Sequence, residues 1–160
     1  MKIKMTVLTP KNQASKSIEN QKKTLIGLGK SDRVIEQKLI NDHQFYWIIQ
    51  PKDQSEYEDI LKKAAKGEVT IKAFYRTIIK WISRANKLCK KFGKANEWIK
   101  RWIVKQLHKQ QGVGGGGDDL IAQIEAMNEQ EIKEFIEISD LKEMQTFLQQ
   151  ELFTIEIIEP

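Results

Sequence analysis

Lysines and arginines recur along one side of a helix that the sequence predicts over residues 70–92. On a helical wheel of about 100° per residue, the basic side chains of this stretch share one side: Lys72, Arg76, Lys80, Arg84, Lys87, Lys90, Lys91 and Lys94. Apolar side chains such as Phe74, Trp81 and Ile82 fall on the opposite side. No acidic residue occurs between positions 70 and 94, so no i,i+4 ion pair offsets the row. Because unmixed positive charge repels itself, the row indicates a negatively charged partner.

A second helix, predicted over residues 95–111, extends the basic surface. Arg101 and Lys105 point away from its apolar side, and Trp98 and Trp102 lie on the flank between the two sides. Cations of this kind contact nucleic-acid phosphates and release counterions, while indole rings stack on unpaired bases. The expected contact residues for DNA or RNA are Arg76, Lys80, Arg84, Lys87, Lys94, Trp98, Arg101 and Lys105. Tryptophans on a helix flank also pack neighbouring helices together, and the sequence leaves both roles open.

The C-terminal part of the chain carries charge of the opposite sign. The net charge is +5, but residues 72–115 hold 12 Lys/Arg against one acid, whereas residues 116–160 hold 12 acids against 2 lysines. This acidic segment is a second candidate for the counter-charge, either folded over the basic face or supplied by another subunit. The alternative hypothesis is therefore a structural or assembly protein that forms homo-oligomers through basic and acidic surfaces, by analogy with small accessory proteins of viruses and plasmids.

Two glycine-containing stretches resemble phosphate-binding loops but lack essential parts of such loops. The stretch 27–31 ends like a P-loop, yet Thr24 occupies the position of the first glycine. The motif also needs a strand before the loop and a helix after it, and the predicted order here is the reverse. The run 112–117 contains five glycines but is followed by Asp118 and Asp119, which would repel an anion. We therefore expect a polar turn and a flexible break, respectively.

Metal and nucleophile chemistry also lack a readable signature. The two histidines, His43 and His108, belong to different predicted elements, and Cys89 has no second cysteine with which to share a metal. Cys89 also falls on the apolar side of its helix, as a small core residue would. The sequence therefore predicts no metal site, no cofactor and no readable catalytic centre, and an enzyme without a readable motif stays as a third hypothesis.

The basic helices are expected to sit on an α+β scaffold. The predicted strands cover residues 2–9, 33–39, 44–50 and 153–158. The predicted helices cover residues 12–28, 55–67, 70–92 and 95–111, followed by short helices that begin after Asp118, at Asn128, and at Ser139 or Asp140. The last strand is expected to pair with the first, because an isolated strand is not stable. These elements predict a ferredoxin-like β-α-β-β start, an enlarged helical layer and a returning C-terminal strand.

Particular residues set the predicted helix boundaries. Ser55 is a favourable N-cap, and Gly67 and Gly93 are expected to end helices. Asn128 and Glu131 have the spacing of a capping box.

The length and composition favour a single domain over residues 1–160. The chain has 160 residues and 40% hydrophobic content, enough to build one core without disulfides. The expected parts are a β-α-β-β unit over 1–51, a basic helical part over 55–111, a glycine-rich break over 112–117, and acidic helices with the final strand over 118–160. One cysteine, a charged N-terminal run and the lack of an apolar stretch of ~20 residues favour a cytoplasmic protein without a membrane partner.

Overall fold

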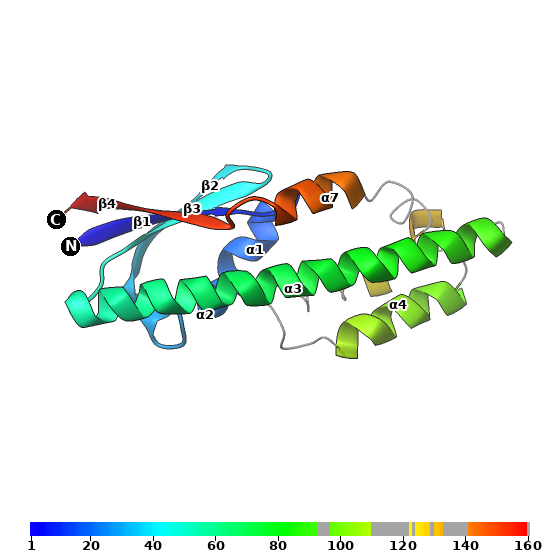
Figure 1. The fold of residues 1–160 in the computed structure, drawn as a ribbon, viewed down its shortest axis with the longest axis horizontal. Coiled ribbons are helices and arrows are strands. Elements are labelled where there is room, and N and C mark those ends of the chain that lie inside the picture. The colour runs from blue at the N-terminus through cyan, green and yellow to red at the C-terminus, as the bar shows by residue number, and fades with distance from the viewer. Residues whose placement is uncertain (93–96, 110–121, 123, 129, 133–140, 160) are drawn as a thin grey trace.

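The structure is a computed structural model that describes residues 1–92, 97–109, 122, 124–128, 130–132 and 141–159. The strands are β1 (Lys2–Leu8), β2 (Val34–Asn41), β3 (Gln44–Ile49) and β4 (Phe153–Glu159). The helices are α1 (Ala14–Asn20), α2 (Lys22–Leu25), α3 (Gln54–Phe92), α4 (Glu97–Lys109) and α7 (Leu141–Leu148), with a short 3-10 turn at Lys30–Arg33. The expected α+β class is confirmed. Figure 1 shows the sheet at one end of the molecule and the long helix α3, which begins beside the sheet and continues past it.

The four strands form one antiparallel sheet in the order β2-β3-β1-β4. Alternate residues of the two central strands are fully buried on one face of the sheet, and they are Ile3, Met5, Val7, Phe45, Trp47 and Ile49. The helices α1 and α2 and the first half of α3 lie on this side (Figure 1). The register sets Met5 opposite both Trp47 and Ile155. The expected pairing of the C-terminal strand with the N-terminal strand is therefore confirmed.

The other face of the sheet is open and of mixed polarity. Tyr46 lies at its centre, where its hydroxyl donates to Glu36 Oε2 at 2.9 Å. The Lys4 ammonium lies 4.5 Å from the centre of the same ring. A cation and a carboxylate thus hold the ring and the hydroxyl of this tyrosine.

The single helix expected over residues 12–28 is wrong. The chain instead forms two short helices that meet at Gln21, whose φ of −88° and ψ of −6° lie close to the bridge region rather than the helical minimum. The second helix ends at Leu25 because Gly27 takes a φ of +109°, a conformation that L side chains rarely adopt.

α3 is one continuous helix of 39 residues, so the expected stop at Gly67 is also wrong. A Cβ atom built on Gly67 would lie 2.4 Å from the Thr24 carbonyl oxygen and 3.0 Å from Leu25 Cδ2. The glycine therefore allows α3 to cross α2 at a separation that any side chain would forbid. It serves a close packing contact and does not end the helix.

The N-cap of α3 is Asp53 and not Ser55. The Asp53 Oδ1 atom accepts a hydrogen bond from the Glu56 amide at 2.8 Å, and the Asp53 carbonyl accepts one from the Tyr57 amide at 3.1 Å. Aspartate and serine are about equally favourable at this position. Cap preference alone therefore does not choose between them, and Ser55 falls within the first turn.

The second half of α3 extends beyond the sheet and forms an arm with α4, which runs back beside it (Figure 1). At about 1.5 Å per residue, α3 is about 58 Å long. The hydrophobic core continues along it, where Ile82 and Ala85 of α3 and Ile103 of α4 are buried. On another side of α3, the Tyr75 ring meets Phe147 of α7 edge-on, with ring centres 5.5 Å apart.

The segment after α4 is described only in part. The Asn128 Oδ1 atom accepts from the Glu131 amide at 2.8 Å, which confirms the predicted N-cap. The stop at Gly93, the break at 112–117 and the helix starts after Asp118 and at Ser139 or Asp140 lie outside the described residues. No described helix combines the length and the apolar character needed to cross a membrane.

We expect Gly67→Ala to lower the free energy of unfolding by about 1–3 kcal/mol, the usual cost of overpacking. At an open helical position, glycine to alanine would raise the free energy of unfolding by about 1 kcal/mol through helix propensity. A lower free energy of unfolding in Gly67→Ala would therefore be due to the steric conflict. Urea denaturation followed by circular dichroism measures the effect. Ala65→Gly, at an exposed position of α3, is the control and should lose about 1 kcal/mol through propensity alone. A Gly67→Ala protein more stable than the wild type would contradict the close crossing.

Tyr75 should make the fold sensitive to alkaline pH. Burial raises the pKa of Tyr75 to about 12, against a smaller opposing effect of its hydrogen bond with Ser17. The unfolded chain releases this proton near pH 10, so the folded state binds it more tightly and stability falls as the pH rises from about 10 to 12. We expect Tyr75→Phe to flatten this part of a plot of urea midpoint against pH. An equally steep alkaline loss in the variant would show that another group is responsible.

Candidate nucleic-acid interface

Six cations of the basic row predicted on α3 face solvent. Arg76, Lys80, Arg84 and Lys87 are exposed, as are Lys90 and Lys91. Phe74, Ile82 and Ala85 are buried on the other side of the same helix. Because α3 is uninterrupted, the first four cations follow one line along the arm at intervals of about 6, 6 and 4.5 Å.

Four cations of this row, Arg76, Lys80, Arg84 and Lys87, lack carboxylate partners within the described part of the chain. The ion pairs around the sheet include Lys2 with Glu159 at 3.0 Å and Arg33 with Glu56 at 2.8 Å. None of those pairs involves Arg76, Lys80, Arg84 or Lys87. The row therefore concentrates positive potential on one side of the arm.

An aromatic contact joins α3 to α4 beside the row. The rings of Trp81 and Trp102 meet edge-on, with centres 5.2 Å apart and planes at 85°. The Arg84 guanidinium lies 5.0 Å and the Lys80 ammonium 5.7 Å from the centre of the Trp81 ring. The indole N–H of Trp81 is buried without a hydrogen-bond partner among the described residues. Trp81, which the sequence pattern assigned to the apolar side, thus lies at the border between apolar and basic sides.

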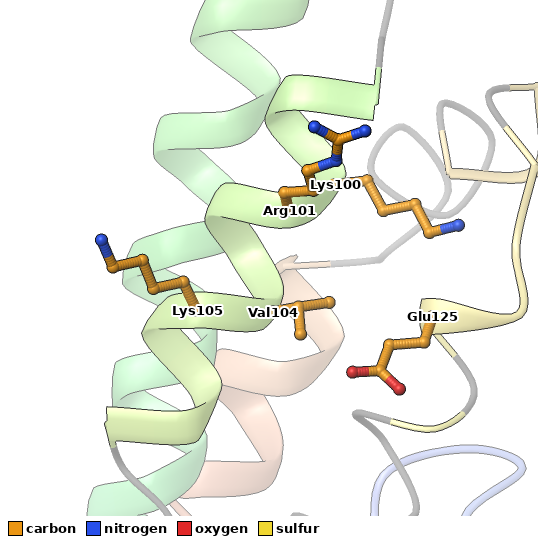
Figure 2. Close-up of a pocket in the computed structure, with 5 residues that line it drawn as sticks. All are labelled: Lys100, Arg101, Val104, Lys105 and Glu125. Carbon is orange, nitrogen blue, oxygen red and sulfur yellow. The ribbon is translucent and has the colours of Figure 1, made fainter.

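The outer side of α4 contributes Arg101 and Lys105, which are both exposed. Next to them lies a shallow hollow of ≈ 350 Å³, lined by Lys100, Arg101, Val104, Lys105 and Glu125. Figure 2 shows Lys100 and Glu125 extending toward the same space from two segments, whereas Lys105 points away from it. Lys100 also donates to the Met127 carbonyl, so this lysine helps hold the following segment against α4.

The structure brings together six of the eight predicted contact residues on one helical arm. Arg76, Lys80, Arg84 and Lys87 lie on α3, and Arg101 and Lys105 lie on α4 across the Trp81–Trp102 contact. Lys94 lies outside the described residues. Trp98 belongs to α4 through its backbone, but its side chain is not described. Trp102 is partly buried and packs the two helices together, which was one of its two predicted roles.

α7 and the chain that leads into β4, which belong to the acidic segment, follow a different side of α3 from the basic row. Phe147 of α7 packs against Tyr75, and the Leu152 amide donates to Glu68 Oε2 at 2.8 Å. Lys72, which the pattern grouped with the basic row, is partly buried and donates to the Gln150 carbonyl. This basic residue therefore anchors the returning chain, and the row from Arg76 to Lys87 remains exposed.

The described residues contain no group of three or more histidine, cysteine, aspartate or glutamate side chains that could hold a metal ion. His43 is exposed and lies 2.7 Å from Asp42 Oδ1 through its Nδ1 atom, at the turn between β2 and β3. The chemistry that the described arm offers is therefore that of fixed cations and aromatic rings.

No protein-family model, no curated protein and no solved structure matches this chain.

We expect Trp102→Ala to lower the free energy of unfolding by about 2–4 kcal/mol, because the ring closes the contact between α3 and α4. The control is Lys105→Ala, an exposed change three positions away on α4, which should stay within about 0.5 kcal/mol of the wild type. Urea denaturation measures both. A Trp102→Ala protein of unchanged stability that no longer binds nucleic acid would show that this ring serves a ligand and not the packing.

Proposed function

We propose that this chain is a small, cytoplasmic, non-enzymatic protein that binds nucleic acid by contacting backbone phosphates through the arm formed by α3 and α4. The observation that carries the proposal is the row of Arg76, Lys80, Arg84 and Lys87. These cations are exposed on one side of one helix and have no carboxylate partner among the described residues. Such a row attracts a polyanion, whose binding releases counterions.

The spacing of the row supports contact with a phosphate backbone. Its members lie about 4.5–6 Å apart along the helix axis, while a duplex carries one charge per about 3.4 Å of each strand. A straight helix laid along such a backbone meets several phosphates at once. Phosphate contacts position a protein without reading bases, so the proposed binding is independent of sequence.

The tryptophans support phosphate contact more than base stacking. Trp81 and Trp102 hold each other edge-on, and Lys80 and Arg84 lie over the Trp81 ring. These contacts occupy part of the ring surface that a base would need for stacking. Trp98 remains the stacking candidate from the sequence. We therefore expect a duplex to bind at least as tightly as a single strand.

We further propose that the sheet is of the ferredoxin-like kind, with α4 and α7 as additions to its helical layer. The strand order β2-β3-β1-β4 and the helices between β1 and β2 support this assignment. Such a sheet would serve as the platform from which the basic arm extends.

Assembly of a homo-oligomer through basic and acidic surfaces is the alternative proposal. It predicts a mass above 18.7 kDa that falls as salt rises, because contacts between opposite charges are screened. α7 and the chain before β4 contact α3 at Tyr75, Lys72 and Glu68. Glu125 of the acidic segment lies beside Arg101 and Lys105 at the hollow on α4, a contact between acidic and basic parts that this alternative would use.

The test is the salt dependence of binding to a short fluorescent duplex and to the matching single strand, followed by anisotropy. Four phosphate contacts predict a loss of affinity of roughly 150-fold between 50 and 200 mM salt. Arg76→Glu with Lys87→Glu should weaken duplex binding strongly and reduce the slope of log K against log salt by about two units.

The matched control is Lys62→Glu with Lys66→Glu, which makes the same change of net charge at exposed positions of α3 over the sheet. This control should bind almost as the wild type does. If both double variants weakened duplex binding equally, the loss of affinity would come from the change in net charge alone. That result would refute a binding site on the arm. Absence of duplex binding at 50 mM salt would refute the proposal and favour the assembly alternative.

A further inference from the structure

β4 is an edge strand, and its outer backbone groups have no partner strand within the described residues. The Leu8 amide donates to the Leu152 carbonyl at 2.8 Å across the β1–β4 ladder. Along a strand, the backbone N–H and C=O groups of successive residues point alternately to one neighbouring strand and to the other side. The N–H and C=O groups of Thr154 and Glu156 therefore point toward β1. The residues that present free N–H and C=O groups along the edge are Phe153, Ile155 and Ile157.

The side chains of these three residues form an apolar strip on the helix-bearing face of the sheet. Phe153 and Ile155 are partly buried, whereas Ile157 is 51% exposed. α3 runs beside the strip, where its Glu68 accepts a hydrogen bond from the amide of Leu152. By helical periodicity, the flank of α3 that carries Glu68 also carries Tyr57, Leu61 and Ala65. A free strand edge and an apolar helix flank therefore border the same space.

The opposite edge of the sheet, β2, is protected in ways that β4 is not. Its ladder with β3 is irregular near both ends. It also carries Glu36 and Lys38, and its Gln37 side chain is held by Glu19 at 2.6 Å. Bulges and charges are common devices against pairing between edge strands. β4 pairs regularly with β1 from Phe153 to Ile157, and its one shift of register, opposite Lys2 and Ile3, lies beyond this stretch.

We propose that β4 pairs antiparallel with β4 of a second copy of this chain, so that two four-stranded sheets join into one. With the two-fold axis at Ile155, this residue pairs with Ile155 of the second copy. Phe153 then pairs with Ile157 of the second copy. All of these positions have outward backbone groups, which allows about six hydrogen bonds. Their side chains meet as apolar pairs on the helix-bearing face.

The outer face of the joined sheet favours the same register. There Thr154 meets Glu156 of the second copy, so no two carboxylates face each other within this stretch. Moving the axis to Glu156 would set Glu156 opposite itself, and moving it to Thr154 would set Ile157 opposite Glu151. At the ends of the preferred register Glu151 faces Glu159, whose carboxylate Lys2 holds at 3.0 Å.

This dimer does not depend on the proposed function. The contact lies at the sheet, whereas the basic row lies on the arm that extends beyond it (Figure 1). A two-fold axis through β4 would direct the two arms away from each other, so that one dimer would present two separate basic rows. The contact is also made by backbone and apolar groups, so salt should not dissociate it.

Sedimentation equilibrium and amide hydrogen exchange test the dimer. The expected mass is twice 18.7 kDa at low and high salt alike, with slow exchange at the Phe153, Ile155 and Ile157 amides. Ile157→Pro removes an outward N–H group without disturbing the ladder to β1, and should give a folded monomer. A monomeric wild type, or fast exchange at these three amides, would overturn the proposal. A dimer that dissociates with salt would also overturn it, in favour of contacts between opposite charges.

A matched pair of lysine substitutions distinguishes the two edges of the sheet. Ile157→Lys on β4 and Leu39→Lys on β2 alter residues that are 51% and 45% exposed, respectively. Ile157→Lys should yield a monomer and Leu39→Lys should remain a dimer, both with the circular dichroism of the wild type. The reverse result would assign the contact to β2 and refute the pairing through β4.

Discussion

The crossing of α3 over α2 at Gly67 is the contact on which the rest of the arrangement depends. It lets the helix approach the Thr24 carbonyl more closely than any residue with a Cβ atom would allow. Since α3 continues without a break to Phe92, its position at this crossing also sets the direction in which the arm leaves the sheet. Beyond the crossing, α4 and α7 pack against the sides of α3 that carry apolar residues.

Cations near the sheet differ in their partners from four cations on the arm, Arg76, Lys80, Arg84 and Lys87, which have no carboxylate partner among the described residues. Around the sheet, cations pair with carboxylates, as in Lys30 with Asp59 at 3.5 Å. Along the arm, Lys72 and Lys100 bind backbone carbonyls and Arg84 lies over an indole ring. Carbonyl and aromatic contacts orient a cation without cancelling its charge. The row from Arg76 to Lys87 therefore keeps its positive charge, while Lys80 and Arg84 within it lie over the Trp81 ring.

The sequence determines local features of this fold better than features that require knowledge of neighbours. Alternation of Ile3, Met5 and Val7 suffices to predict β1, because the period of two is a property of the strand itself. Gly27 and Gly67 look alike in sequence, yet one ends a helix through a positive φ and the other admits a neighbouring helix. The basic row was predictable from helical spacing alone. The position of Trp81 between Trp102 and two cations was not, because it depends on where α4 packs.

The continuity of α3 has a consequence for how this chain can change in length. One residue inserted between Gly67 and Arg76 would turn everything beyond it by about 100° relative to the sheet. The cations would then rotate toward α4 or α7, and apolar side chains would rotate toward water. Insertions of seven or eleven residues, close to whole numbers of turns, would restore the phase and lengthen the arm by about 10–17 Å. The number of residues in α3 therefore sets the orientation of the arm about the helix axis. We expect insertions of whole helical turns to be tolerated and single-residue insertions or deletions not to be.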